Sequence, residues 1–182
     1  MVASQQSGQA LVVVDVQVGV VASAVERDSV VANIAMLVET ARAAGVPVVW
    51  VLHDDDDLER GSAAWQLVPE LTMGEGEPVV HKHYGDSFEA TGLDTVLTDL
   101  GVGHVVVAGA QSDACILATL YGGAVRGFGV TLVSDAHTTE DLGALGGAPP
   151  EAVIAHTTLV WKLHAAPGRE TGVAATADID FR

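Results

Sequence analysis

Short apolar segments alternate with helix-compatible segments along most of the chain. Buried parallel strands are continuous apolar runs, often β-branched, that end at polar or turn residues. Segments of this type are residues 10–14, 46–52, 79–81, 105–108 and 130–133, and residues 173–176 could supply a last strand. Helices are expected over residues 28–44, 91–100 and 149–161, and from residue 112 onwards.

Local signals place the ends of these helices. Asp28 or Ser29 could cap the first helix, and Gly45 follows its last residue. Pro149 and Pro150 suit a first helical turn, where a missing N–H costs nothing. The alternation predicts an α/β fold of three layers (αβα), with a Rossmann-like, mostly parallel sheet of about six strands covered on both faces.

An open parallel sheet places its ligand site beyond the carboxyl ends of its strands. Several chemically active side chains follow the predicted strands, so we expect them to line one rim. They are Asp15, His53, Lys82, the turn before Cys115, Asp135 and His137.

The composition is that of a folded, acidic chain. Its 182 residues are 49% hydrophobic, which supports a sizeable core, and we expect residues 1–182 to form a single domain. The formal net charge is −16 with eight Lys and Arg residues, which would repel nucleic acid and anionic membranes at long range. Neutral or cationic small molecules are therefore the favoured substrates.

Cysteine usage and hydropathy bear on location. The one cysteine excludes an intramolecular disulfide and a multi-cysteine zinc site, which fits a reducing compartment. The first ten residues lack the pattern of a signal peptide, and no apolar run approaches the roughly 18 residues that span a bilayer. We therefore expect a cytoplasmic protein.

The stretch 105–127 combines a strand, a small-residue turn and a helix that begins near Cys115. If Ser112 is the N-cap, Cys115 lies in the first turn, where unpaired amides and the helix dipole favour a thiolate. A lone cysteine is also commonly an inert core residue, so this stretch alone leaves both roles open. Lysine and aspartate could activate a thiol, and histidine is the usual alternative base; spacing does not choose between them.

Three motifs carry a resemblance to a known family. An apolar strand ends in Asp15-Val16-Gln17, Lys82 stands in HKHYGDSF, and Cys115 stands in AGAQSDACILAT, with VSDAHTT downstream. These motifs resemble, in kind and order, those of the isochorismatase-like cysteine hydrolases, and the likeness extends over residues 11–158. It implies the fold of that family and a catalytic triad. Cys115 would be the nucleophile, Asp15 the general base and later acid, and Lys82 the group that lowers the thiol pKa.

The resemblance also implies a particular turn and assembly. A non-proline cis peptide would join Ala110 to Gln111, and the backbone N–H groups of Ala114 and Cys115 would form the oxyanion hole. A homo-oligomer is implied as well, with residues 119–128 or the C-terminal helix at the contact.

Further residues are candidates for the substrate pocket: Gln17, His53, Trp65, Tyr84 and His137. Gln17 is expected to be a hydrogen-bonding wall residue rather than a catalyst. Tyrosine and tryptophan usually pack, and Trp65, in a long loop, is the aromatic residue most expected to touch substrate.

The segment after the second predicted strand bears on metal binding. Nicotinamidases of the resembled family carry there an Asp-x-His pair and a further histidine that hold a divalent metal. In this chain His53 is followed by the aspartates 54–57 and by no histidine before His81. We therefore expect no metal and no other cofactor, and nicotinamide is disfavoured as the substrate. The aspartates could attract Ca²⁺ or Mg²⁺ loosely, although such runs are usually solvated loops.

These observations predict a cysteine hydrolase that cleaves a C–N amide bond of a small molecule through a thioester. The activities of the resembled family include the opening of streptothricin-type lactams, and such a lactam is one candidate substrate, because the chain and its loop HDDDDLERGSAAWQL are acidic. Two alternatives stay open: an isochorismatase that cleaves a vinyl ether with an acid such as Asp15, and an inactive relative that serves as a binding or scaffold subunit.

Overall fold

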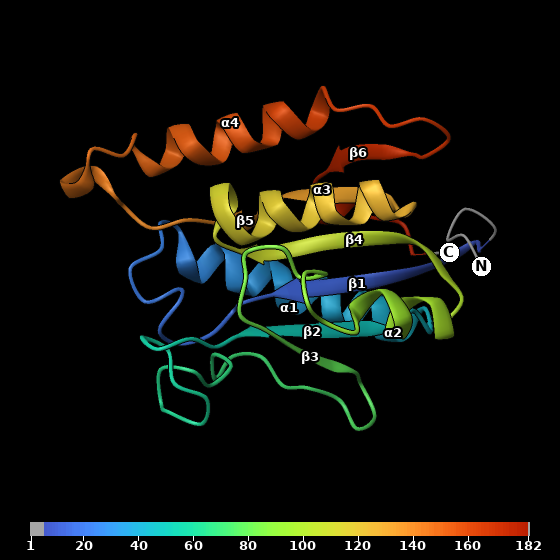
Figure 1. Cartoon of the computed structure of the whole chain (residues 1–182), viewed down its shortest axis with the longest axis horizontal. Coiled ribbons are helices and arrows are strands. Elements are labelled where there is room, and N and C mark those ends of the chain that lie inside the picture. The colour runs from blue at the N-terminus through green and yellow to red at the C-terminus, as the bar shows by residue number, and fades with distance from the viewer. Residues whose placement is uncertain (1–5, 182) are drawn as a thin grey trace.

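The computed structural model describes residues 6–181, which form a six-stranded sheet with helices on both faces (Figure 1). The strands are β1 (Gly8–Val14), β2 (Val48–His53), β3 (Val79–Lys82), β4 (Val102–Ala110), β5 (Gly129–Thr138) and β6 (Thr171–Ala174). They lie in the order β3-β2-β1-β4-β5-β6, and every adjacent pair is parallel. Their carboxyl ends therefore share one edge, at the left of Figure 1.

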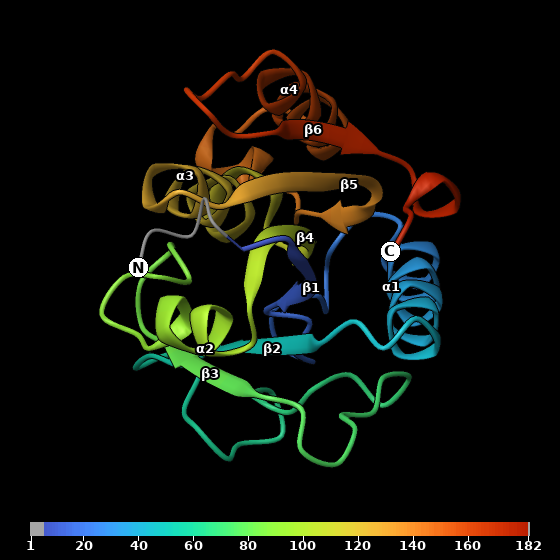
Figure 2. The same cartoon turned by 90° about the vertical axis from the view of Figure 1, so that its right-hand side faces the viewer.

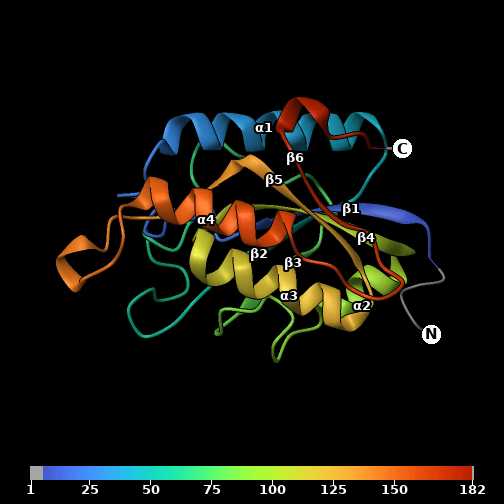
Figure 3. The same ribbon diagram turned by 90° about the horizontal axis from the view of Figure 1, so that it is seen from above.

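Helices cover both faces of the sheet. The helices are α1 (Arg27–Ala43), α2 (Leu93–Asp99), α3 (Leu117–Arg126) and α4 (Pro150–Lys162). Figure 2 and Figure 3 show α1 on one face and α2, α3 and α4 on the other. Alternate residues of β1 enter the two cores: Leu11 and Val13 pack with α1, whereas Val12 and Val14 pack with α2 and α3. The predicted three-layer α/β fold with a parallel sheet of six strands is confirmed.

Helix starts are confirmed at α4 and corrected at α1. α4 begins at Pro150, as the two prolines predicted. α1 begins at Arg27, after Glu26 in the left-handed region with a φ of 53°. Asp28 therefore lies inside the first turn, where its charge faces the positive helix end, and neither Asp28 nor Ser29 is the cap.

The strand β5 continues beyond the predicted residues 130–133, because its polar end still pairs with β4. Gly109 pairs with His137, and Ala110 pairs with Thr138. Asp135 and His137 thus lie within the strand rather than past it. The Asp135 carboxylate accepts hydrogen bonds from the backbone and hydroxyl of Thr176, so it fastens the chain after β6 instead of lining a site at the rim.

The ends of β1 and β4 approach each other closely at Gly109. This glycine has a φ of 128°, and a Cβ at this position would overlap the backbone carbonyl of Val14. Glycine is therefore required for β4 to pass so close to β1. As a result, Asp15, one residue past β1, lies beside the turn that carries Cys115.

None of the helices described within residues 6–181 is long and apolar enough to cross a membrane. The expectation that no signal peptide is present rests partly on residues 1–5, which lie outside the described residues. The single-domain assignment stays a prediction.

Candidate active site

Three side chains from three strand ends meet inside the protein. Asp15 follows β1, Lys82 is the last residue of β3, and Cys115 lies in a π-helical turn, Ser112–Ile116, after β4. Lys82 Nζ lies 2.6 Å from Asp15 Oδ2 and 3.2 Å from Cys115 Sγ. Asp15 and Lys82 are fully buried, and Cys115 is partly buried. The structure thus brings together the thiol, carboxylate and ammonium that the sequence analysis singled out.

Sheet order explains why the cationic side chain that meets Asp15 is a long one. The strand β2 separates β3 from β1, so only a long side chain on β3 can reach past β2 to Asp15. The backbone of Asp15 has a φ of 53°, a conformation that aspartate tolerates better than β-branched residues do. Its amide still donates to the carbonyl of Val51 at 2.9 Å, which ties Asp15 to β2.

Burial and mutual contact set the charges of the cluster. Burial raises the pKa of Asp15, although the ammonium of Lys82 opposes this effect. Burial alone would lower the pKa of Lys82, but the facing Asp15 carboxylate and Cys115 sulfur outweigh it and raise that pKa. The resting pair is a carboxylate and an ammonium, with Asp15 a stronger base than an exposed aspartate.

The expectation of a thiolate at Cys115 is wrong for the resting site, although Lys82 lowers the thiol pKa as the resemblance implied. Burial and the Asp15 carboxylate raise the pKa of the thiol to about 11, and Lys82 opposes them only in part. The resting sulfur is therefore a thiol, which becomes a nucleophile when its proton moves to a base. Asp15, which interacts with both Lys82 and Cys115, is the base within reach.

The turn after β4 differs from the expected capped helix. Ser112 is the first residue of the π-helical turn and caps nothing; its hydroxyl lies 2.8 Å from His137 Nδ1. The peptide between Ala110 and Gln111 is cis, as the resemblance implied. The Ala114 amide donates to the Gln111 carbonyl at 3.2 Å, because that carbonyl immediately precedes the turn and accepts its first amides. In this conformation Ala114 is not a free oxyanion donor.

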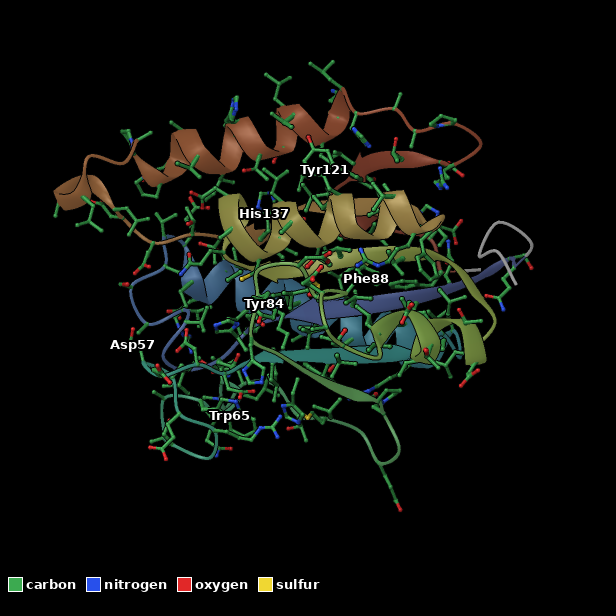
Figure 4. The ribbon with its side chains drawn as sticks, viewed as in Figure 1. Asp57, Trp65, Tyr84, Phe88, Tyr121 and His137 are labelled. Carbon is green, nitrogen blue, oxygen red and sulfur yellow. The ribbon has the colours of Figure 1, made fainter. Side chains whose placement is uncertain are left out.

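A cavity of about 420 Å³ opens beside Asp15 and Cys115. Its wall comes from segments that follow β1, β2, β4 and β5, and includes Val20, His53, Asp55, Asp57, Gln111 and Glu140. Figure 4 shows Asp57 at the left, on the segment between β2 and β3. The sequence analysis missed Val20 and Glu140 as cavity residues. Their position shortly after the ends of β1 and β5 is the sequence signal that could have indicated them. Three carboxylates in addition to Asp15 thus face the cavity.

Of the five predicted pocket residues, His53 lines this cavity and the others do not. Gln17 is fully buried, and its amide group bonds the backbones of His53 and Trp65. The ring of Trp65 stacks on His81, with 5.7 Å between centroids, so it packs against another side chain. Both residues lie outside the lining of the cavity, which differs from the expected wall role of Gln17 and from the expected substrate contact of Trp65.

Tyr84 and His137 also have other roles. Tyr84 is 58% exposed, and it contributes its backbone carbonyl, which accepts a hydrogen bond from Lys82 Nζ at 3.1 Å. His137 is buried between the hydroxyls of Ser112 and Thr158, at 2.8 and 3.0 Å. Burial lowers the pKa of His137 to about 4, so it is a neutral hydrogen-bonding residue.

Two aspartates of the acidic loop after β2 lie close to histidine side chains. Asp55 Oδ2 lies 3.0 Å from His53 Nε2, and Asp54 Oδ2 lies 3.3 Å from His83 Nδ1. Within residues 6–181, no three side chains of histidine, cysteine, aspartate or glutamate are grouped so that they could hold a metal ion.

The parallel sheet and the thiol at its carboxyl rim define an α/β protein with a site suited to nucleophilic chemistry. The sequence matches the Isochorismatase domain family over residues 9–144, which is most of the chain, and the protein belongs to that family.

Relatives with assigned names include hydrolases and an effector. The chain is 38% identical over 148 residues to a streptothricin hydrolase of Streptomyces noursei, covering 76% of this chain and 58% of that protein. It is 34% identical over 120 residues to the secreted isochorismatase effector Isc1 of Verticillium dahliae, covering 64% and 63%. It is 29% identical over 141 residues to the ureidoacrylate amidohydrolase RutB of Klebsiella pneumoniae, covering 59% and 60%. The chain thus spans about three fifths of the length of these relatives.

A solved structure confirms the fold. An isochorismatase from Pseudomonas putida KT2440 superposes with a TM-score of 0.86 at 28% sequence identity, covering 99% of this chain and 92% of the other.

Proposed function

We propose that the protein is a cysteine hydrolase that cleaves a C–N amide bond of a small molecule through a thioester at Cys115. The observation that carries the proposal is the buried ammonium of Lys82, which contacts both a carboxylate, at 2.6 Å, and the thiol sulfur, at 3.2 Å. Membership of the isochorismatase family and the likeness to an amidohydrolase and a streptothricin hydrolase support it.

In the proposed cycle Asp15 carries the proton. It accepts the proton of the Cys115 thiol while the sulfur bonds to the amide carbonyl carbon, which gives a tetrahedral oxyanion. The C–N bond then breaks as Asp15 returns the proton to the leaving nitrogen, and a thioester remains. Water attacks the thioester with Asp15 as base, and the sulfur leaves the acid product as a thiolate that regains a proton from Asp15.

Two kinds of group stabilise charge in this cycle. The Lys82 ammonium faces the sulfur whenever it carries negative charge. The backbone N–H of Cys115 is the proposed oxyanion donor, joined by that of Ala114 once its 3.2 Å bond to the Gln111 carbonyl opens.

The cavity wall favours a neutral or cationic amide. His53 is the one basic side chain among the residues that line it, against the carboxylates of Asp55, Asp57 and Glu140. Asp55 pairs with His53, whereas Asp57 and Glu140 form no ion pair with another residue in the range 6–181. Asp57 and Glu140 are the carboxylates available to an amine of the substrate, and a streptothricin-type lactam is the candidate we propose.

A substrate panel tests the activity. The purified protein is incubated with a streptothricin, uncharged amides, ureidoacrylate and isochorismate, and the products are measured by mass spectrometry. We expect a gain of one water on a cationic or uncharged amide. Hydrolysis of isochorismate with every amide left intact would contradict the proposal.

Charge selectivity has its own test. Asp57→Asn and Glu140→Gln are each expected to raise KM for a cationic amide about two- to fivefold, because one solvent-exposed ion pair contributes about 0.2–1 kcal/mol. KM for an uncharged amide and kcat are expected to stay constant. Glu59→Gln, on the same loop segment and outside the cavity wall, is the matched control. Equal KM changes for the charged and uncharged amides would refute a role in recognising a cation.

The vinyl-ether reaction is the second candidate, because the family is named for isochorismatases and one relative is an isochorismatase effector. Isochorismate carries two carboxylates, which would face Asp55, Asp57 and Glu140 in the cavity. Like-charge repulsion disfavours that complex, and the same panel decides between the two reactions.

We also propose that the protein forms a homo-oligomer through the face of α3 and α4. Tyr121, Val125 and Leu159 are 38%, 74% and 52% exposed there, and Tyr121 packs edge-on against Trp161, which joins the two helices into one surface. Sedimentation velocity of the full chain is expected to show a dimer or larger species, and Val125→Glu is expected to dissociate it. A wild-type monomer at micromolar concentration would contradict the contact.

A cytoplasmic location is part of the same proposal. The mechanism needs Cys115 as a free thiol, and a reducing compartment preserves free thiols. Alkylation of Cys115 in freshly lysed cells tests it, with an oxidised and unreactive cysteine as the contrary result.

A further inference from the structure

The Lys82 ammonium has more acceptors around it than protons to give. Four acceptors surround Lys82 Nζ: Asp15 Oδ2 at 2.6 Å, the Tyr84 carbonyl at 3.1 Å, His53 Nδ1 at 3.2 Å and Cys115 Sγ at 3.2 Å. An ammonium has three N–H groups. The side chain is fully buried, so these protein atoms take the place of solvent as partners for the charge.

The protonation state of the sulfur decides which acceptors are used. Burial raises the pKa of Cys115 to about 11, and a neutral thiol is a weak acceptor. The carboxylate of Asp15 takes one N–H, and the Tyr84 carbonyl takes another. His53 Nδ1 is then the better partner for the third N–H in the resting site.

An imidazole nitrogen accepts only when it carries no proton, so His53 must hold its proton on Nε2. The structure provides a partner for that proton, because Asp55 Oδ2 lies 3.0 Å from His53 Nε2. The other oxygen, Asp55 Oδ1, accepts the backbone amides of Asp57 and Leu58 at 2.9 and 2.8 Å. The turn of the acidic loop thereby fixes the carboxylate that orients the imidazole.

The backbone of His53 is held as firmly as its ring. The Gln17 side chain accepts from the His53 amide at 2.8 Å and donates to the His53 carbonyl at 2.9 Å. Its amide nitrogen also donates to the Trp65 carbonyl at 2.8 Å. His53 is therefore held at two places: Gln17 holds its backbone, and Asp55 holds its imidazole ring.

We propose that His53 is a positioning residue that accepts one N–H of Lys82 in the resting enzyme, in a tautomer set by Asp55, and yields that N–H to the sulfur when Cys115 is deprotonated. The inference rests on the proposed function in so far as it concerns turnover. When the Cys115 proton moves to Asp15, the thiolate becomes a strong acceptor, and one N–H of Lys82 turns from His53 Nδ1 to Sγ. No atom is gained or lost in this step. It gives the run of aspartates after β2 a role in the chemistry through Asp55.

A pair of variants separates positioning from substrate contact. Asn places an amide oxygen near the position of Nδ1, whereas Gln places its polar group near Nε2. His53→Gln is expected to lower kcat about tenfold or more with KM within about twofold, because a misplacement of about 1 Å can cost on the order of 100-fold in rate. His53→Asn is expected to recover most of kcat. Equal losses in the two variants, or a change confined to KM, would overturn the inference.

A second pair tests the link through Asp55. Asp55→Asn can still accept the turn amides but presents an NH₂ donor to His53 Nε2, so the imidazole proton is expected to move to Nδ1 and kcat to fall as in His53→Gln. The matched control is Asp56→Asn, which makes the same change of charge at the next residue. It is expected to change neither the tautomer of His53 nor kcat. Nitrogen-15 NMR of the imidazole, assigned by the signal lost in His53→Gln, reports the tautomer directly.

The NMR readout needs no substrate, so the two proposals can fail separately. A wild-type protein that is inactive on every amide but holds its proton on His53 Nε2, dependent on Asp55, would refute the proposed function and support the contact. An active protein with the proton on Nδ1, or with a tautomer unchanged in Asp55→Asn, would overturn the inference alone.

Discussion

Cys115→Ala is expected to lower kcat/KM for the amide substrate by more than about 1,000-fold, because removing a covalent nucleophile removes the whole route through the thioester. The remaining rate would come from substrate binding and backbone amides alone. Steady-state kinetics on the substrate that the panel identifies measures the loss, and intact-protein mass spectrometry checks for the acyl adduct of the wild type.

The alanine variant is expected to stay folded, since Cys115 packs at the edge of the core formed with α2 and α3 and is only partly buried. Circular dichroism and thermal unfolding provide this control. A folded Cys115→Ala protein with wild-type kcat/KM would exclude thioester chemistry at this site.

Asp15→Asn is expected to inactivate the enzyme and at the same time to make its thiol easier to ionise. Activity is expected to fall by more than about 1,000-fold, because the amide cannot accept the thiol proton or protonate the leaving nitrogen. The Asp15 carboxylate raises the pKa of Cys115 and Lys82 lowers it, so loss of the carboxylate lowers the thiol pKa from about 11. The rate of alkylation by iodoacetamide as a function of pH measures that change.

These opposite effects distinguish a proton carrier from a residue that only activates the thiol by its charge. The matched control is Asp56→Asn, which removes the same charge from the neighbouring loop and is expected to alter neither rate. Slower alkylation together with lost activity would show that Asp15 supports the site in another way, for instance by holding Lys82.

The pH dependence of the wild type follows from the same carboxylate. Burial raises the pKa of Asp15, and only its unprotonated form can act as base. Activity is therefore expected to be lost as the pH falls through a value above the ordinary range for aspartate, and to be retained above it. A profile of kcat/KM whose acid limb lies at or below the pKa of an exposed aspartate would contradict this expectation.

Much of the site could be predicted because the topology follows from local patterns. Continuous apolar runs separated by helices imply parallel strands, and parallel strands put their carboxyl ends on one edge. Asp15, Lys82 and the turn of Cys115 could therefore be assigned to the same rim without any contact being known. His53 was placed there for the same reason, and it lines the cavity.

Other parts could not be predicted, because they depend on the environment of a side chain rather than on its position along a strand. The lowered thiol pKa assumed an exposed helix start, whereas burial and a nearby carboxylate dominate at Cys115. Gln17 and Trp65 were assigned to the pocket from their segments, but hydrogen bonding and stacking direct them into its support. Glu140 was missed because β5 continues to Thr138, which moves the rim farther along the chain.

The sequence by itself determined the order of strands and helices and the acidic charge, because these depend on residue type and on spacing along the chain. Its resemblance to a known family singled out the three residues that carry the proposed chemistry. Only the tertiary structure decided the charge state of Cys115, the number of acceptors around Lys82 and the carboxylates that face the cavity. The physical reason is that a pKa and a hydrogen-bond partner depend on burial and on distances across the sheet. Lys82 illustrates both: its place at a strand end could be predicted, but not the geometry that surrounds three N–H groups with four acceptors.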